Sequence, residues 1–257
     1  MAAFSVLWAI SLRKNDASIV DWYWGTGFGV IALTYALLHG GSASAWVLTL
    51  LTVVWSLRLT GYMVRRHLWK GEEDARYAAM REAGGPTFKR DSLFKIFWLQ
   101  AVVMWMVATP QHAGLLYGDG VDRPLAYFAG LFLFAVGLTL ETIADAQLDQ
   151  FIRTPGNRGR LMTSGLFAMV RHPNYTGEII LWWGLGLLGY ALSGLFWSFL
   201  GPAILTFLLV KVSGVPMLDA HLSTRAGWAE YAARTPALFP FRSTRPARSQ
   251  PSGDAIT

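Results

Sequence analysis

Cysteine is absent from the 257 residues, and charged residues make up only 15% of them. Without cysteine there is no disulfide framework, no thiolate nucleophile and no cysteine metal site. Hydrophobic residues account for 53% of the chain, which is more than a soluble domain needs. The composition predicts an all-α, multi-pass integral membrane protein.

Acidic residues are fewer than basic ones, and the formal net charge is +6. In a soluble protein such an excess would indicate nucleic acid as a partner. In a membrane protein it is the bias of Lys and Arg toward cytoplasmic loops. If the chain crosses the membrane seven times, every basic residue except Arg58 and Arg123 falls on one side. This asymmetry supports the seven-span topology, with the basic residues on the cytoplasmic side. We also expect a monomer surrounded by membrane lipids, located in a bacterial inner membrane, and no nucleic acid partner.

The apolar segments predict seven membrane helices in a single domain over residues 1–242, followed by a disordered tail at 243–257. The predicted segments are residues 1–12, 17–39, 45–64, 96–109, 124–152, 175–192 and 195–213. A membrane helix needs about 20 residues, so the first segment is a tilted or partial span, or the core of a signal peptide. If it is partial, six helices cross. Residues 65–95 are expected to form a cytoplasmic loop, partly helical, and residues 110–123 a loop on the opposite side.

The usual nucleotide and metal motifs are missing. No Gly-x-Gly-x-x-Gly follows a strand, no Walker loop occurs, and no histidine pair has metal-ligand spacing. We therefore expect no metal, and the usual nucleotide-binding folds are excluded as far as motifs can exclude them. The chemistry has to come from polar side chains at the cytoplasmic ends of apolar helices.

The most informative stretch is residues 165–182, where polar residues stand at the beginning of an apolar helix. Pro173 suits the first turn of a helix, where its missing N–H is not needed. Asn174 and Glu178 are four residues apart and share one helix face, with Tyr175 beside them. A polar tip on an apolar helix indicates a polar ligand.

Residues 153–171 contain four arginines and no acid. Such a loop binds anions, either lipid headgroups or the phosphates of a cofactor. Just before it, polar residues four apart form one stripe at the end of the longest helix. They are Glu141, Asp145, Asp149 and Arg153. The stripe is either an ordinary ion-paired helix end or, at Asp145 above all, a ligand contact.

Two charged residues lie in or beside spans nearer the N-terminus. Arg58 shares a stripe with Trp55, Tyr62 and Arg66, and an arginine inside a span marks a functional site unless it snorkels to the headgroups. Asp21 begins a span among aromatic residues, which are typical of a membrane interface.

These motifs resemble a known family. Arg153-Thr-Pro-Gly, Gly165-Leu-Phe, Asn174-Tyr-Thr-Gly-Glu178-Ile-Ile and Ala237-Leu-Phe-Pro-Phe241 are similar to the membrane steroid 5-alpha-reductases, and closest to their bacterial branch of uncharacterised members. The similarity is clearest over residues 141–241. The Arg-His-Pro-x-Tyr element alone also resembles isoprenylcysteine and phospholipid methyltransferases, which bind S-adenosylmethionine there.

The resemblance implies a reductase that holds NADPH between cytoplasmic helix ends and reduces the enone double bond of a steroid-like substrate. It assigns Asn174 and Glu178 to the nicotinamide amide, and Arg153, Arg158 and Arg160 to the phosphates and ribose. The full set of expected cofactor residues is Arg58, Tyr62, Asp145, Arg153, Arg158, Arg160, Arg171, His172, Asn174, Tyr175, Glu178 and Tyr231.

The substrate end departs from the family pattern. The family's catalytic glutamate and tyrosine align loosely with Asp21 and Trp55, and an indole donates a hydrogen bond but cannot act as an acid. Either Asp21, kept neutral by an apolar site, or Tyr62 holds the substrate carbonyl. Asp21 paired with Arg58 would instead be a structural lock. Two other functions stay open: a membrane methyltransferase using S-adenosylmethionine, and a non-catalytic sterol- or lipid-binding protein.

Overall fold

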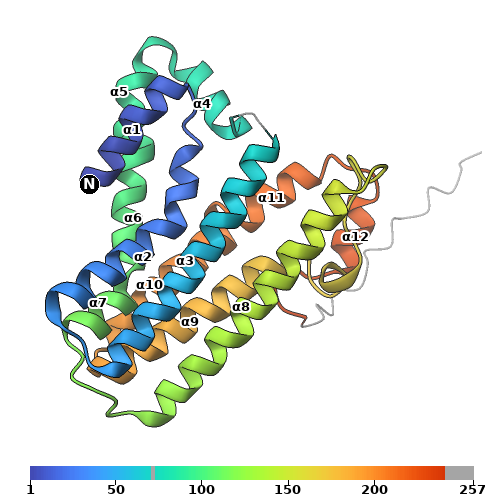
Figure 1. Cartoon of the computed structure of the whole chain (residues 1–257). Helices are drawn as coiled ribbons and strands as arrows, with labels where there is room; N and C mark the ends of the chain where they lie inside the picture. Colours follow the sequence, from blue (N-terminus) through green and yellow to red (C-terminus); the bar gives the residue numbers. More distant parts are fainter. Residues whose placement is uncertain (71–72, 241–257) are drawn as a thin grey trace, which may run out of the picture. The chain divides into compact units, whose positions relative to one another are not determined.

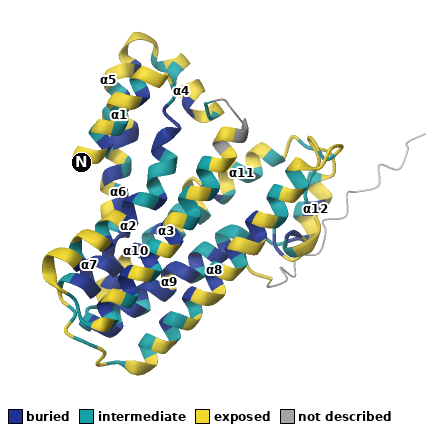
Figure 2. Ribbon diagram, in the orientation of Figure 1, coloured by how far each residue is buried: buried dark blue, intermediate teal, exposed yellow. Residues whose placement is uncertain are grey.

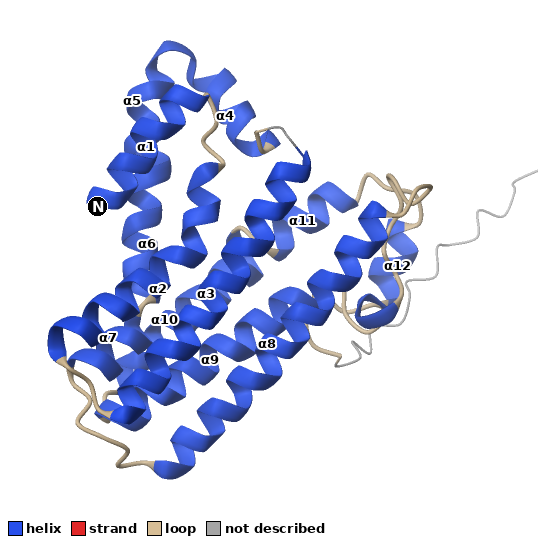
Figure 3. Cartoon of the chain, viewed as in Figure 1, coloured by secondary structure: helices blue, strands red, loops and turns tan. Residues whose placement is uncertain are grey.

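Helices make up most of the described residues (Figures 1 and 3). The structure is a computed structural model that describes residues 1–70 and 73–240, and these residues contain no strand, so the all-α prediction is confirmed. Its α-helices are α1 (Ala2–Lys14), α2 (Ile19–His39), α3 (Ala43–Lys70), α4 (Ala75–Gly84), α5 (Phe88–Ser92), α6 (Leu99–Val107), α7 (Thr109–Leu116), α8 (Pro124–Arg153), α9 (Pro173–Ser193), α10 (Leu200–Phe207), α11 (Val215–Leu222) and α12 (Trp228–Arg234). Shorter 3₁₀ or π segments are η1 (Gly85–Thr87), η2 (Leu93–Trp98), η3 (Gly165–Ala168), η4 (Phe196–Phe199) and η5 (Leu208–Val212).

Contacts divide the chain into two compact units. The first unit is Met1–Leu138 with Ile179–Thr206, and the second is Thr139–Glu178 with the described residues from Phe207 onward. Helices α8 and α9 each contribute to both units. The single domain expected over residues 1–242 stays a prediction, and the predicted tail at 243–257 lies outside the described residues.

Small residues bring α2 and α3 together in the first unit. A Cβ atom added to Gly25 would lie 2.7 Å from Thr60 Oγ1, and one added to Gly29 would lie 3.1 Å from Ser56 Cβ. The hydroxyls of Thr26 and Thr60 are hydrogen-bonded at 2.8 Å. Close backbone approach and hydroxyl pairs are typical of helix contacts in membranes.

Aromatic side chains fill the core of the first unit. Phe28 from α2 contacts Trp55 from α3 and Trp182 from α9, with ring centroids 5.8 and 4.7 Å away, and none of the three is exposed. Helix α9 also meets α8 closely, because a Cβ atom on Gly184 would lie 2.7 Å from the Phe134 nitrogen. Trp55, expected at the substrate end, is therefore a core side chain in this unit.

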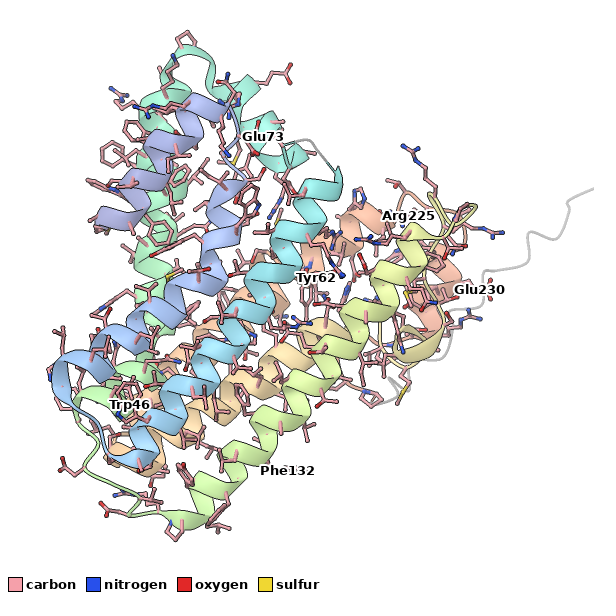
Figure 4. The ribbon with its side chains drawn as sticks, in the orientation of Figure 1. Trp46, Tyr62, Glu73, Phe132, Arg225 and Glu230 are labelled. Atoms are coloured by element: carbon pink, nitrogen blue, oxygen red, sulfur yellow. The ribbon has the colours of Figure 1, made fainter. Side chains whose placement is uncertain are left out.

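The apolar helices support a helical membrane protein. By length and composition, three helical segments among the described residues are long and apolar enough to cross a membrane, or four if the bent pair of Ala75–Val107 and Thr109–Leu116 counts as one span. The three are Ala43–Arg66, Pro124–Arg153 and Phe196–Leu222. Many positions along α8 are exposed (Figure 2), and they include the large apolar side chains of Phe128 and Phe132, the second of which is labelled in Figure 4. A membrane gives these surfaces an apolar surrounding.

The sequence predicted seven spans, more than the three or four segments that pass by length and composition among the described residues. Helix α1 has 13 residues, fewer than a crossing needs. Helices α2 and α9 have 21 residues each, but neither is among the segments that pass by length and composition. The integral membrane class is supported, and the seven-span topology remains a proposal.

One loop prediction needs correction. Residues 109–116 form α7, not part of a loop on the far side, and Thr109–Leu115 are buried. The hydroxyl of Thr109 donates to the Ser198 carbonyl and accepts from the Gly201 N–H, so tertiary contacts hold this polar stretch as a helix bent 51° from the one before it. The stretch at 65–95, expected to be partly helical, is helical over most of its described length, since α3 extends to Lys70 and α4, α5 and η2 follow.

Candidate functional site

The polar face predicted at the beginning of α9 is present in the second unit. Pro173 is the first residue of the helix, and Asn174 and Glu178, one turn apart, are both half-buried. Within the part of the chain that the structure describes, the Asn174 side-chain amide makes no hydrogen bond. A half-buried amide in this position retains two donors and an acceptor for a ligand.

Arg171, expected to bind an anion, is held by protein groups. Its Nη2 lies 2.6 Å from Asp219 Oδ2, and its Nη1 donates to the Thr235 carbonyl at 2.6 Å. The guanidinium also lies over the Trp228 ring, 5.5 Å from the centroid. Arg171 therefore links α9 to α11 and to the chain after α12.

His172 is 1% exposed and meets the same carboxylate. Its Nε2 lies 2.7 Å from Asp219 Oδ1, and its ring stacks on Tyr175 with centroids 5.5 Å apart. Burial lowers the pKa of His172 below its ordinary 6.5, while the Asp219 carboxylate opposes part of that shift. A neutral imidazole with its proton on Nε2 donates to Asp219.

The C-terminal segment is fastened along the beginning of α9. The backbone N–H groups of Arg171 and His172 donate to the carbonyls of Pro236 and Ala237, at 2.9 and 3.0 Å. The Thr176 hydroxyl donates to the carbonyl of Leu238. The Ala237-Leu-Phe-Pro motif thus closes the helix start, and its last residue, Phe241, lies outside the described residues.

Tyr231, expected among the cofactor residues, is 3% exposed, and its hydroxyl donates to the Phe167 carbonyl at 2.7 Å. Burial raises the pKa of Tyr231 to about 12. The phenol therefore stays protonated and ties α12 to η3.

The arginine loop is exposed, as an anion-binding segment requires. Arg158 and Arg160 are exposed, and among the described residues neither guanidinium meets a carboxylate. Arg225 adds a third cation, because its Nη1 donates to the Arg160 carbonyl at 2.8 Å (Figure 4). Arg153 differs, since its Nε lies 3.1 Å from Asp149 Oδ2.

The acidic stripe of α8 is buried at two positions. Glu141 is 2% exposed and Asp145 is 4% exposed, so this part of the stripe is not a solvated helix end. Gln147 accepts the Leu166 N–H at 3.0 Å and lies against Gly165, whose φ of +60° and tight surroundings exclude a side chain. The Gly165-Leu-Phe motif is therefore a tight turn against α8.

The first unit places Asp21 in a hydrogen-bonded polar cluster. Its carboxylate accepts from the Tyr77 hydroxyl at 2.7 Å and from Arg76 Nη2 at 3.0 Å, and Gln100 Nε2 donates to Tyr77 at 3.2 Å. In the same unit Glu73, labelled in Figure 4, accepts from the Ala17 N–H at 2.7 Å. Asp21 pairs with Arg76, whereas the sequence suggested Arg58 as its partner.

Arg58 and Tyr62 lie one turn apart on α3. The Arg58 guanidinium is 5.8 Å from the Tyr62 ring centroid, a cation–π contact. Both side chains are half-buried. Their predicted roles toward cofactor and substrate stay predictions.

Sequence reasoning missed Asp219, which holds two of the predicted residues. One signal was available: Asp219 is the only acid between residues 179 and 229. Its partners lie 48 and 47 residues away, so no local periodicity pairs them. Among the residues that the structure describes, no group of three or more His, Asp or Glu side chains could hold a metal ion.

Comparison with known proteins gives a family and several relatives. The family described as "Protein of unknown function (DUF1295)" matches residues 7–235. The probable O-methyltransferase ustE of Ustilaginoidea virens is 37% identical over 133 residues, which is 51% of this chain and 44% of that protein. An uncharacterised protein of Schizosaccharomyces pombe is 26% identical over 211 residues, 72% of this chain and 61% of that protein.

A steroid-processing relative also matches. The 3-oxo-5-alpha-steroid 4-dehydrogenase 2 of Homo sapiens is 32% identical over 126 residues, 49% of this chain and 46% of that protein. The chain thus spans about half the length of the curated relatives it matches. No solved structure matches.

Proposed function

The chain belongs to the DUF1295 family, which is steroid 5-alpha-reductase-like, and from this premise we propose that it is a membrane-embedded, NADPH-dependent reductase. The reaction is hydride transfer to the enone double bond of a steroid-like or other hydrophobic substrate. Relatives named as 3-oxo-5-alpha-steroid 4-dehydrogenases support an oxidoreductase acting on CH–CH groups.

The observation that carries the proposal is the Asn174–Glu178 face of α9. A nicotinamide carboxamide has a carbonyl that accepts and an NH₂ group that donates. The Asn174 amide, without a protein partner among the described residues, matches the carbonyl, and the Glu178 carboxylate one turn away matches the NH₂ group. The donor set at this helix start therefore fits the group.

The phosphates of NADPH fit the arginine loop of the same unit. Arg158 and Arg160 are exposed cations on a loop that has no acid between residues 153 and 171. Guanidinium groups match phosphate oxygens with two parallel hydrogen bonds. Arg153, Asp145 and Tyr175 complete the proposed cofactor residues of this unit.

When bound, NADPH supplies the hydride. The chain's own residues hold the carboxamide at Asn174 and Glu178, hold phosphates at the arginines, and stabilise the developing negative charge on the substrate carbonyl oxygen. Asp21 or Tyr62 is proposed as the donor to that oxygen, and Arg58 as a further cofactor residue.

The proposed setting is a bacterial inner membrane crossed seven times by one monomer, with the cofactor side cytoplasmic. The distribution of Lys and Arg supports this orientation. It puts the arginine loop where NADPH is available.

A second candidate is a membrane methyltransferase using S-adenosylmethionine on a lipid or prenyl substrate. One observation favours it, the 37% identity to the probable O-methyltransferase ustE. Against it stands the chemistry of the loop, because S-adenosylmethionine is a cation with one carboxylate. It offers no phosphate to Arg158 and Arg160, which meet no carboxylate among the described residues.

The cofactor that copurifies with the chain separates the two candidates. Mass spectrometry of the purified protein should find NADP, and S-adenosylhomocysteine in its place would reverse the ranking. In parallel, Asn174→Ala and Glu178→Ala should both lose NADPH affinity while thermal stability in detergent is kept. Unchanged affinity in both variants would remove this face from the nicotinamide.

A further inference from the structure

Asp219 on α11 holds the two residues that precede α9. One of its oxygens accepts from Arg171 Nη2 at 2.6 Å, and the other accepts from His172 Nε2 at 2.7 Å. The carboxylate is 22% exposed and its Arg171 partner 13%, so the contacts are shielded from water. Charge-assisted hydrogen bonds in such surroundings are short and directional.

The same helix start is fixed by the chain after α12. Carbonyls of Pro236 and Ala237 accept the N–H groups of Arg171 and His172, and Arg171 Nη1 donates to Thr235. We call Asp219, Arg171, His172 and residues 235–238 the clamp. Every contact in it lies within the second unit.

Helix geometry relates the clamp to the proposed cofactor face. Successive residues turn by about 100° around a helix, so residues two apart point in roughly opposite directions. The clamp holds Thr176, within α9, through its hydroxyl bond to Leu238, and His172, just before the helix, through its side chain. Asn174 and Glu178 stand two residues before and two residues after Thr176, on the opposite face of the helix. The clamp therefore anchors one face of the turn and orients the other.

We propose that Asp219 is a positioning residue for the nicotinamide end of the cofactor, acting through Arg171 and His172 on the direction of Asn174 and Glu178. The inference rests on the proposed function and adds a residue that neither the motifs nor the family resemblance assigned. A loosened helix start misplaces the carboxamide contacts, and small misplacements of positioning groups cost large factors in rate.

The test compares two ligands on the full chain in detergent. NADPH reaches both the α9 face and the arginine loop, whereas 2′,5′-adenosine diphosphate carries the phosphates without the nicotinamide. Asp219→Asn removes the charge that holds Arg171. We expect this variant to bind NADPH with about tenfold lower affinity, by analogy with the loss of one charge-assisted hydrogen bond. Its affinity for 2′,5′-adenosine diphosphate should be unchanged. Asp219→Glu keeps the charge and should recover part of the loss.

A matched control is Glu230→Gln, which removes a carboxylate from the same unit. Glu230 is 80% exposed and pairs only with Arg234 at 3.4 Å within the described residues (Figure 4). This variant should bind both ligands as the unchanged chain does. Hydrogen exchange followed by mass spectrometry should show faster exchange at residues 171–176 in Asp219→Asn and not in Glu230→Gln.

The outcomes separate the two proposals. The positioning role is overturned if Asp219→Asn lowers the affinity for both ligands equally, or if it keeps normal NADPH affinity while hydrogen exchange is faster. Neither result contradicts the proposed reductase function. An unchanged chain that binds neither ligand overturns the proposed function and the cofactor role of Asp219 with it. If Asp219→Asn fails to fold, Arg171→Lys takes its place, because lysine keeps the charge and loses the second contact. The same selective loss of NADPH is then expected, and equal loss of both ligands contradicts the proposal.

Discussion

Arg158 and Arg160 decide the choice between NADPH and NADH if they bind the 2′-phosphate. Both are exposed and meet no carboxylate among the described residues, so neutralising them removes no ion pair from the fold. Each charge-assisted phosphate contact is worth about 1.5–3 kcal/mol. We expect Arg158→Gln with Arg160→Gln to abolish the preference for NADPH, measured as the ratio of kcat/KM for the two cofactors, while NADH activity persists.

Arg234→Gln is the control for that experiment. Arg234 is an exposed arginine of the same unit that lies outside the loop and pairs with Glu230. Its replacement should leave the cofactor ratio unchanged. If the double variant loses activity with both cofactors equally, the loop serves the diphosphate or the fold.

Asp21 could serve as a hydrogen-bond donor to the substrate or as a structural counter-ion, and a substitution distinguishes the two roles. The arrangement suits an ionised carboxylate, because Arg76 and Tyr77 both donate to it. Asp21→Asn keeps an acceptor for Tyr77 and removes one of the two carboxylates that pair with Arg76, the other being Asp74; the Arg76 side chain is 47% exposed. We therefore expect a modest loss of about 0–1 kcal/mol in the free energy of unfolding, restored in part by adding Arg76→Gln.

Turnover of an enone substrate completes this test. An amide still donates to a carbonyl, so turnover should persist in Asp21→Asn. Normal stability together with lost turnover would instead identify Asp21 as an acid in the reaction.

At the scale of single elements, the beginning of α9 should be sensitive to pH. Burial holds the pKa of His172 below 6.5, so the unfolded chain takes up this proton at a higher pH than the folded one. Stability from the neutral imidazole is fully present above about pH 6.5 and is lost as the pH falls toward the folded pKa. The groups facing the ring are Asp219, Arg171 and Tyr175.

The measurement is the melting temperature in detergent between about pH 7.5 and about pH 5.5, a range that brackets the ordinary histidine pKa. As the pH is lowered, the melting temperature of the unchanged chain should decrease, and that of His172→Gln should decrease less steeply. Identical slopes would show that His172 titrates alike in the folded and unfolded chains.

Helices α8 and α9 depend on glycine where they meet in the first unit. A Cβ atom on Gly184 would lie 2.8 Å from the Gly130 carbonyl oxygen, closer than real contacts allow. We expect Gly184→Val to destabilise the protein by about 1–3 kcal/mol, the usual range for overpacking. Thermal unfolding in detergent measures it, with Gly61→Val as control, because a Cβ atom on Gly61 meets nothing within 4 Å. If Gly184→Val and Gly61→Val destabilised the protein equally, the close contact of α8 and α9 at Gly184 would be contradicted.

At the scale of the whole molecule, the absence of cysteine makes the topology directly measurable. Helix α8 has 30 residues, about 45 Å at the usual rise per residue, so its two ends should lie on opposite sides of the membrane. Asp122→Cys replaces an exposed residue just before it, and Thr163→Cys replaces an exposed residue in the loop that follows it. An impermeant maleimide should label the first in intact cells and the second only after permeabilisation. Labelling of both from one side would refute the proposed orientation.

Composition and periodicity alone determined the membrane class, the all-helical fold and the span of α8, because the burial of apolar side chains and helix periodicity are written in local sequence. They also placed Asn174 and Glu178 on one face, since residues four apart in a helix share a face whatever surrounds it. The acid-free loop at 153–171 likewise needed only its own residues.

Tertiary structure alone decided how the predicted residues are used. Arg171, His172 and Tyr231 read as ligand contacts in the sequence, but their side chains hold Asp219 and Phe167, partners 47 to 64 residues away. Asp21 meets Arg76 and Tyr77 across 55 and 56 residues. Pairing at such separations depends on how helices pack, which no local pattern encodes. For the same reason the polar stretch from Thr109 became the buried helix α7, held by its contacts with Ser198 and Gly201.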